Sequence, residues 1–278
     1  MALTQLHRNG YKLFTDKDHG KIVDWFLENQ EDENKLPSPF HTSRYSIVWK
    51  IENFEGNAYF IKRFRPESFP VRLKDSLRGS RALRSLKAGE MLEKRDFSVP
   101  RIIAMGERRS LGLLSDSFMI TLPIEGISLL ELLLPVRDFK IKRSVIRRVG
   151  HEIGRLHREG IIHGDLIPGN IFAMGKNDNI KLCLLDNERT RKVNKLPHNE
   201  RIKNLVQFNR VIVPRVTASD RVRFFDAYLE ENRDLESVRK KLLRKIGEIT
   251  SERVMRHRGI SAEKRKFTTF RAVMAWKE

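Results

Sequence analysis

Cysteine is almost absent from this sequence, and no apolar run is long. The 278 residues include a single cysteine, Cys183, which excludes an internal disulfide and a cysteine-based zinc site. The longest apolar stretch, 127–136, is interrupted by Glu131 and is far shorter than the roughly 20 residues that span a bilayer. Residues 1–18 lack the apolar core of a secretory signal. We therefore expect a protein of the cytoplasm.

Acidic residues are too few to balance the basic ones. The chain has 55 Lys and Arg against 36 Asp and Glu, which gives a net charge of +19. Residues 239–271 alone contain twelve basic and three acidic residues. Such an excess attracts polyanions, including nucleic acid, anionic membranes and phosphorylated substrates. No zinc-finger spacing or aromatic-rich RNA-binding motif accompanies it, so no nucleic-acid partner is expected.

The expected secondary structure changes character along the chain. The first part predicts helices at 20–29 and 80–94 and strands at 45–51, at 58–64, after Pro100 and at 118–122. The second part predicts helices at 128–134, at 140–159 and from His198 onward, with short apolar strands at 161–163 and 180–185. This pattern predicts an α+β protein with a β-rich unit over 1–124 and a mainly helical unit over 125–278.

A loop between apolar segments contains the residues most informative about chemistry. Residues 162–172 have the sequence IHGDLIPGNIF, in which Asn170 follows Asp165 by five positions. Phosphoryl transfer needs a carboxylate that accepts the proton of the attacking hydroxyl, and oxygen ligands that hold magnesium against the phosphates. We interpret Asp165 as the catalytic base and Asn170 as a Mg²⁺ ligand. Asp186 ends the next apolar run and is the expected second ligand.

The first unit is expected to contribute groups that bind the phosphates of ATP. Lys62 lies within an alternating strand pattern, where an inward lysine needs a partner or a ligand, and Lys50 in the preceding strand is the alternative. The helix at 80–94 should provide the acidic partner of this lysine. Glu90 follows Leu86 by four positions and is expected on the core face, with Glu93 as the alternative.

A glycine-rich phosphate loop is missing from the first unit. Between the two strands at 45–51 and 58–64 the single glycine is Gly56. We expect residues 42–46, with the sequence TSRYS, to cover the phosphates instead. Ser43 and Arg44 are the candidate contacts there, through a hydroxyl, backbone N–H groups or the guanidinium.

Two further absences argue against a regulated protein kinase. The loop reads His163-Gly164-Asp165, without the arginine that in such kinases contacts an activation-loop phosphate. Asp186 is followed by Asn-Glu-Arg instead of Phe-Gly, and no Ala-Pro-Glu follows. The sequence therefore contains no obvious residues that would form a platform for a peptide substrate.

From about residue 43 to 229 the sequence resembles the lipopolysaccharide core kinases of the Kdo/WaaP family. The resemblance rests on 59–62 (YFIK), 80–82 (SRA), 98–100 (SVP), 163–170, 203–205 (KNL) and 217–229 (TASDRVRFFDAYL). It implies a bilobal protein-kinase-like fold with a small β-rich N-lobe and a larger helical C-lobe. It also implies ATP and Mg²⁺ as cofactors and a sugar hydroxyl of the lipopolysaccharide inner core, on heptose or Kdo, as acceptor. Lys62, Asp165, Asn170 and Asp186 match the motifs of that family.

Two other hypotheses remain open at this stage. A small-molecule kinase similar to the aminoglycoside or choline phosphotransferases also uses His-Gly-Asp with a downstream Asn. A pseudokinase that binds an anionic surface is the non-enzymatic alternative. If the acceptor is linked to lipid, we expect peripheral attachment at the inner face of the cytoplasmic membrane through the basic cluster 239–271.

Overall fold

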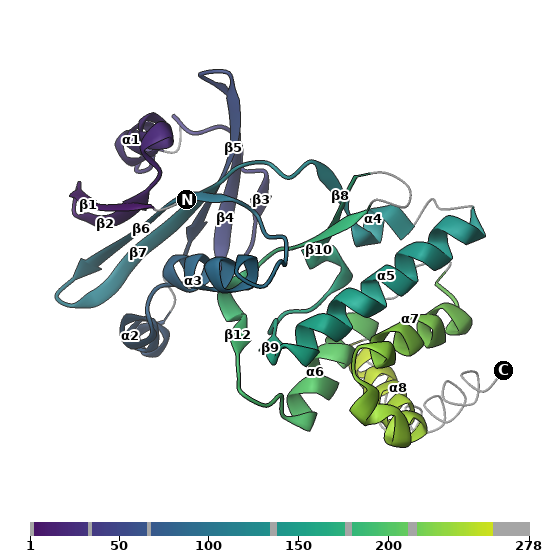
Figure 1. Ribbon diagram of the computed structural model, residues 1–278. Helices are drawn as coiled ribbons and strands as arrows, with labels where there is room; N and C mark the ends of the chain where they lie inside the picture. Colours follow the sequence, from purple (N-terminus) through teal and green to yellow (C-terminus); the bar gives the residue numbers. More distant parts are fainter. Residues whose placement is uncertain are drawn as a thin grey trace. The chain divides into compact units, whose positions relative to one another are not determined.

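The protein divides into two compact units, Met1–Ile124 and Glu125–Glu278. The structure is a computed structural model that describes residues 3–32, 35–65, 68–133, 138–175, 180–210 and 216–257 (Figure 1). The first unit is built around a sheet and the second mainly from helices, which confirms the predicted α+β class. No helix in the described ranges is long and apolar enough to cross a membrane.

An antiparallel seven-stranded sheet forms the first unit, in the order β1-β2-β6-β7-β5-β4-β3. Its strands are β1 (Thr4–Arg8), β2 (Tyr11–Thr15), β3 (His41–Thr42), β4 (Ser46–Phe54), β5 (Asn57–Phe64), β6 (Ile102–Ser110) and β7 (Leu113–Thr121). Turns at Asn9-Gly10 and Glu55-Gly56 have positive φ angles, and they connect β1 to β2 and β4 to β5. Gly accepts this left-handed conformation at low cost, and so does Asn in the first turn, so the glycine in each turn favours a tight hairpin.

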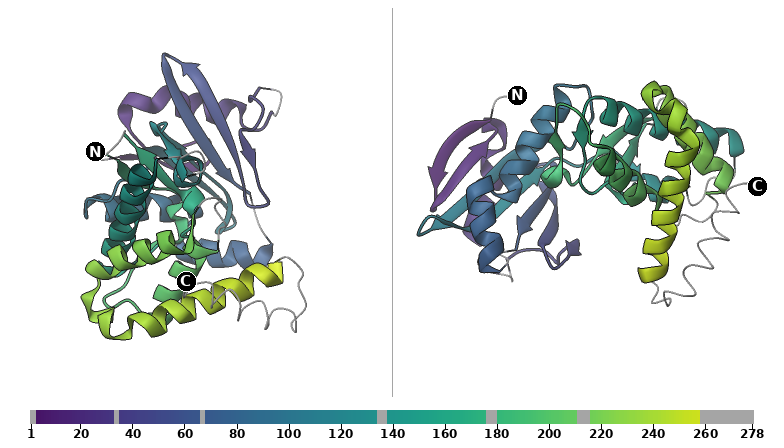
Figure 2. Two further views of the ribbon diagram at one scale, coloured as in Figure 1. Left: turned by 90° about the vertical axis from the view of Figure 1, so that its right-hand side faces the viewer. Right: turned by 90° about the horizontal axis from the view of Figure 1, so that it is seen from below.

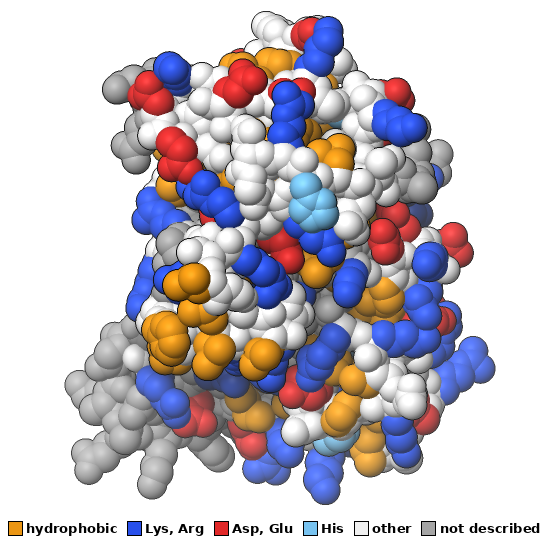
Figure 3. Space-filling view, turned by 90° about the vertical axis from the view of Figure 1, so that its left-hand side faces the viewer, with side chains coloured by type: hydrophobic (Ala, Val, Ile, Leu, Met, Phe, Trp, Pro, Cys, Tyr) orange, Lys and Arg blue, Asp and Glu red, His pale blue; other side chains and the backbone are white. Residues whose placement is uncertain are grey.

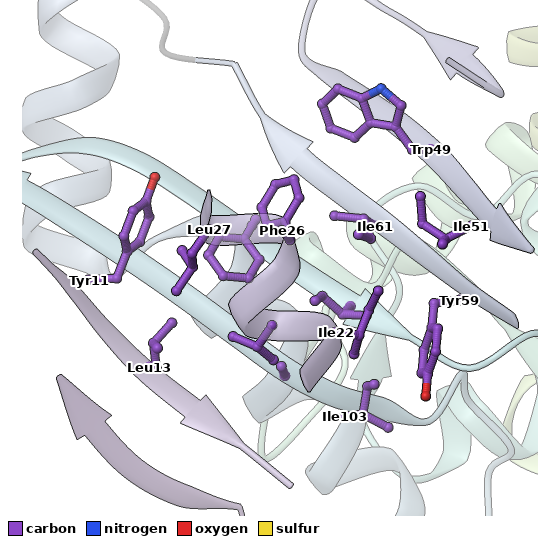
Figure 4. Close-up of a cluster of buried hydrophobic side chains, with 14 of the residues drawn as sticks. Tyr11, Leu13, Ile22, Phe26, Leu27, Trp49, Ile51, Tyr59, Ile61 and Ile103 are labelled. Carbon is purple, nitrogen blue, oxygen red and sulfur yellow. The ribbon is translucent and has the colours of Figure 1, made fainter. Parts of the chain in front are cut away.

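One face of this sheet is covered by α1 (Gly20–Asn29). Ile22 and Phe26 of α1 are buried and lie among side chains of the strands, including Ile61 (Figure 4). The rings of Phe26 and Phe118 meet edge to face with centroids 4.8 Å apart. This cluster is the main core of the first unit.

The opposite face packs against α3 (Arg81–Glu93). Phe64 and Met105 alternate with residues of the α1-facing core and contact Ala82 and Leu86 of α3. Ser80 caps the helix, because its hydroxyl accepts the Leu83 backbone N–H at 3.0 Å. A shorter helix, α2 (Phe69–Arg78), packs against β7. The views in Figure 2 show the helices of this unit beside its twisted strands.

The second unit is a helical body with short strands. Its helices are α4 (Leu129–Leu133), α5 (Phe139–Arg158), α6 (His198–Asn209), α7 (Ala218–Glu230) and α8 (Arg239–His257). Its strands are β8 (Gly126–Ser128), β9 (Ile161–Ile162), β10 (Ile171–Met174), β11 (Lys181–Leu184) and β12 (Arg191–Lys192).

The packing of α5 against α7 depends on two glycines. A Cβ atom on Gly150 would lie 2.4 Å from the Phe224 carbonyl oxygen, and one on Gly154 would lie 2.9 Å from the Tyr228 carbonyl oxygen. These distances leave no room for a side chain, so the two helices approach to backbone contact.

Most elements expected from the sequence are present. The helix predicted at 20–29 matches α1, and those predicted at 80–94 and 140–159 match α3 and α5 within a residue or so at each end. The β1–β2 hairpin and α2 were not predicted. β1 and α2 have much of their surface exposed, so they lack the clear pattern of buried residues that identifies an element. β2 was missed although it alternates buried and half-buried residues, as a strand with one face in the core does.

Candidate active site

The loop after β9 holds Asp165 in the second unit. Gly164 has a φ of +80°, and a Cβ atom there would lie 2.6 Å from the Cβ of Arg189. Glycine is therefore required for the chain to turn beside Arg189. This turn leaves the Asp165 side chain partly exposed, two positions after the end of the buried segment 161–163.

Asn170 closes the same loop back onto Asp165. Its side-chain Nδ2 donates to the Asp165 carbonyl oxygen at 3.0 Å and approaches the Asp165 Oδ2 at 3.4 Å. The backbone N–H of Ile167 also donates to the Asp165 carbonyl oxygen, at 3.1 Å. Since the amide nitrogen of Asn170 is engaged in this way, its carbonyl oxygen is the atom that can ligate a cation.

Asp186 is brought to Asn170 by the β10–β11 hairpin. Ile171 pairs with Leu184, and the Leu185 backbone N–H donates to the Asn170 carbonyl oxygen at 2.9 Å. Asp186 comes next, exposed and with a left-handed backbone, φ +55° and ψ +49°. The predicted ligands Asn170 and Asp186 thus lie at adjacent ends of two paired strands.

The donor chemistry of these two residues fits a magnesium ion. Magnesium prefers hard oxygen ligands and usually takes one or two carboxylates together with waters and phosphate oxygens. An amide oxygen and a carboxylate match that preference. Within the described residues there is no group of three or more His, Cys, Asp or Glu that could hold a metal without such help.

His163 supports the loop from the interior. Its side chain is completely buried, and burial lowers the pKa of the imidazole, while the carboxylates of Asp165 and Asp186 act in the opposite direction. Its backbone N–H donates to the Asn204 Oδ1 at 3.2 Å, and its carbonyl oxygen accepts the Thr190 hydroxyl at 3.1 Å. The loop is therefore anchored on both sides of its first residue.

A chain of hydrogen bonds connects α6 to the same loop. The Gln207 Nε2 donates to the Gly164 carbonyl oxygen at 3.0 Å, and the Asn204 Nδ2 donates to the Gln207 Oε1 at 3.3 Å. The Asn204 Oδ1 also faces His157 Nε2 at 3.4 Å. Sequence patterns did not identify Gln207 as a residue of the site, since a contact to a backbone group 43 residues away leaves no local signal.

His157 is the buried end of this chain. Its Nδ1 lies 2.9 Å from the Tyr228 hydroxyl, which also accepts from Arg201. Burial, and to a smaller extent the positive charge of Arg201, lowers the pKa of His157 to about 3. The ring is neutral, so its Nε2–H can donate to Asn204 while its Nδ1 accepts from Tyr228.

A cavity in the second unit is separate from these residues. It contains about 710 Å³ of space, including its open mouth, and its lining is mostly apolar, with Ile146, Phe208 and Phe224 among the contributors. Of the loop 163–170 it contacts Pro168, and neither Asp165 nor Asn170 nor Asp186 lines it. An apolar lining of this kind does not suit ATP phosphates.

In the first unit, Lys62 lies on the α3-facing side of the sheet. It pairs across the strands with Val48 and Met119. Met119 packs on the α3-facing cluster, and the Lys62 Nζ lies 5.3 Å from the centroid of the Phe64 ring. Lys50, the alternative, is more exposed and forms an ion pair with Glu52 at 2.5 Å. The lower exposure of Lys62 and its place beside Met119 and Phe64 favour it as the inward lysine.

The expectation that Glu90 lies on the core face of α3 is wrong. Glu90 and Glu93 are both exposed, whereas Gly89 is buried at the inward position. Among the described residues neither glutamate forms an ion pair with Lys62. Glu90 as the partner of Lys62 stays a prediction without structural support.

Ser43 and Arg44 form the turn between β3 and β4. The Ser43 hydroxyl accepts the Ser46 backbone N–H at 3.0 Å and lies 3.2 Å from the Ser46 carbonyl oxygen, so it is engaged in the turn itself. Arg44 is exposed, with its guanidinium 5.8 Å from the Tyr45 ring centroid. Of the two, Arg44 is the residue free to reach an anionic ligand.

Comparison with known proteins identifies the family. Residues 42–228 match the model of the lipopolysaccharide kinase (Kdo/WaaP) family. The chain belongs to this family. The resemblance inferred from the sequence motifs is thereby confirmed, and all the candidate residues lie within the matched range.

Two known proteins illustrate the relationship. A solved structure described as WaaP in complex with acyl carrier protein aligns with a TM-score of 0.61 and 19% identity, over 84% of this chain and 97% of that one. This likeness confirms the kinase-like fold of the Kdo/WaaP family member described here. The EKC/KEOPS complex subunit BUD32 of Coccidioides immitis (strain RS) is 33% identical over 93 residues, which are 32% of this chain and 29% of that protein.

Proposed function

We propose that this Kdo/WaaP kinase transfers the γ-phosphoryl group of ATP to a hydroxyl of a heptose or Kdo in the lipopolysaccharide inner core. The observation that carries the proposal is the linked loop in which Asn170 bonds to Asp165 and to Leu185, the residue before Asp186. Within a family of lipopolysaccharide kinases, this loop and the neighbouring end of β11 provide a base and two oxygen ligands in one small region.

Each candidate residue has a defined part in the proposed reaction. Asp165 accepts the proton of the sugar hydroxyl as its oxygen bonds to the γ-phosphorus, and the bond from that phosphorus to the bridging oxygen breaks to release ADP. Asn170 and Asp186 would hold Mg²⁺, which neutralises charge on the phosphates when bound. Lys62 and Arg44 would contact phosphate oxygens.

A transfer assay tests this proposal. The protein is incubated with γ-labelled ATP, Mg²⁺ and lipopolysaccharide truncated to its inner core, and label is measured in the lipid fraction. The control is the Asp165→Asn variant with unchanged circular dichroism. Label in the lipid with the wild type alone supports the proposal. ATP turnover that needs a soluble amino sugar or choline would instead support the small-molecule kinase, and no turnover with any acceptor would indicate a pseudokinase.

We also propose that the enzyme works at the inner face of the cytoplasmic membrane through peripheral attachment. Within the basic cluster, Lys240, Lys241, Arg244 and Lys245 are exposed on α8, and Arg244 pairs with Glu248 at 2.8 Å. The part of the cluster at 258–271 lies outside the described residues. Reversing these four charges to Glu should weaken sedimentation with anionic vesicles at low salt.

A further inference from the structure

The orientation of α2 (Phe69–Arg78) is the reverse of that expected for a surface helix. Its polar side faces the body of the first unit: the Arg72 Nε donates to the Leu114 carbonyl oxygen at 3.1 Å. The Ser76 hydroxyl accepts the Leu114 backbone N–H at 2.7 Å. Asp75 pairs with Arg84 at 2.9 Å. Surface helices usually bury an apolar face and expose a polar one.

The apolar side of α2 consequently faces outward. Phe69, Leu73 and Leu77, spaced four residues apart, are 61%, 43% and 82% exposed. Spacing of four places them along one side of the helix, and we call them the α2 stripe. A group of hydrophobic side chains is visible on this side of the molecule in Figure 3. Leu111, which is fully exposed in the β6–β7 turn, lies close by, since Arg109 bridges that turn to Ser76.

Positive charge borders the α2 stripe. Lys74 is exposed and lies one turn of the helix after Pro70. Arg78 is also exposed and directly follows Leu77. Asp75, the sole acidic residue of α2, points to the opposite side and is engaged with Arg84. The outward surface of α2 therefore combines large apolar side chains with cations and carries no carboxylate of its own.

We propose that the outward side of α2 lies in the headgroup region of an anionic bilayer. Helices that bind in the plane of a membrane interface combine Phe and Leu on one side with Lys and Arg beside them. The cations select an anionic leaflet over a neutral one, and the α2 stripe enters the boundary between headgroups and acyl chains. The inference rests on the proposed function for the identity of that surface, because a lipid-linked acceptor lies in such a membrane.

Vesicle sedimentation tests the contribution of the α2 stripe. Leu77→Ser should weaken partitioning into anionic vesicles about tenfold. This is the effect expected when one leucine side chain no longer enters the apolar part of the bilayer. Phe69→Ser should act in the same direction, and Phe139→Ser is the matched control because Phe139 is similarly exposed, at 69%, but lies on α5. Equal losses for the Phe69 and Phe139 variants, or none for Leu77→Ser, would overturn the proposal.

Charge reversal tests the selection of the lipid. Each cation near an anionic leaflet raises partitioning about fivefold, so Lys74→Glu with Arg78→Glu should reduce it by more than tenfold at low salt. At high salt, where the charge on α8 is screened, the wild-type protein should keep part of its vesicle binding through the α2 stripe. Binding that depends entirely on the α8 cluster would exclude α2 as the contact.

A fluorescent probe locates α2 directly. Leu77→Cys introduces an exposed thiol, while Cys183 is buried and its pKa is raised to about 12, so labelling is selective for position 77. A polarity-sensitive dye there should shift to the blue with anionic vesicles free of lipopolysaccharide and be quenched by spin-labelled lipid. A shift caused by added protein instead of vesicles would indicate a protein partner and overturn the proposal. Because ATP turnover is measured separately, its loss would count against the proposed function and not against the membrane contact.

Discussion

The side-chain amide of Asn170 donates to the backbone carbonyl oxygen of Asp165 at a distance of 3.0 Å. This bond makes the proposed base and a proposed metal ligand parts of one closed turn. Because Leu185 bonds in turn to the backbone of Asn170, Asp186 is held beside the same turn. Chemistry that needs these groups at fixed separations can therefore depend on a short segment of backbone.

Replacing Asp165 with Asn should abolish phosphoryl transfer and leave the fold intact. An amide of the same size cannot accept the proton, and general-base action is worth ~10²–10⁴-fold in rate. The measurement is label transfer to lipid at saturating ATP, with circular dichroism as the test of folding. Activity above about a tenth of wild type would contradict the role of Asp165.

Replacing either proposed metal ligand should change the dependence of the rate on magnesium. Asp186→Ala removes a charged ligand and should lose turnover at all magnesium concentrations. Asn170→Ala removes a neutral ligand, so turnover should recover partly as magnesium is raised. Titrations of ATP turnover against magnesium distinguish the two, and a wild-type titration curve for either variant would show that the residue is not a ligand.

The two candidate lysines should differ in their effect on nucleotide use. Lys62→Ala should raise the KM for ATP by about tenfold or more, the loss of one charge-assisted phosphate contact. Lys50→Ala removes an exposed ion pair with Glu52 and should have little effect. Steady-state kinetics with ATP as the varied substrate decide between them. The reverse order would assign the phosphate contact to Lys50.

Gln207 should act as a positioning residue for the catalytic loop. Gln207→Ala removes the hydrogen bond to the Gly164 carbonyl oxygen, and we expect kcat to fall about tenfold, since small displacements of reacting groups are costly. The KM for ATP should stay unchanged. Lys203→Ala on the exposed side of the same helix is the control. A fall in thermal stability with unaltered kcat would indicate a purely structural role.

Local patterns were enough to predict long helices whose apolar side is buried, although they missed the buried alternation of β2. The helix α1 was predicted residue for residue because Ile22, Val23, Phe26 and Leu27 repeat at helical spacing and all of them are buried. The same reasoning failed for α2, whose apolar residues face outward. Periodicity shows which residues share a side of a helix but not whether the protein covers that side.

The site was predicted where a short motif contains it and missed where the contacts are distant in sequence. Asp165 and Asn170 belong to one loop, so their association could be recognised directly. Glu90 was placed on the core face of α3 from its spacing to Leu86, but Gly89 takes the inward position. A shift of one residue turns a helical side chain by about 100°, which spacing alone does not resolve.

The stability of the protein should decrease on acidification because His157 is buried in its neutral form. The pKa of His157 is lowered from 6.5 to about 3, so between these values the unfolded chain binds a proton that the folded protein does not. The unfolding free energy should then fall by up to about 1.4 kcal/mol for each pH unit below 6.5. Urea denaturation at a series of pH values measures this slope. The His157→Gln variant still contains His163. Its unfolding should take up about one proton fewer in this pH range, so the slope of its unfolding free energy against pH should be smaller. An unchanged slope in that variant would show that acid destabilisation arises elsewhere.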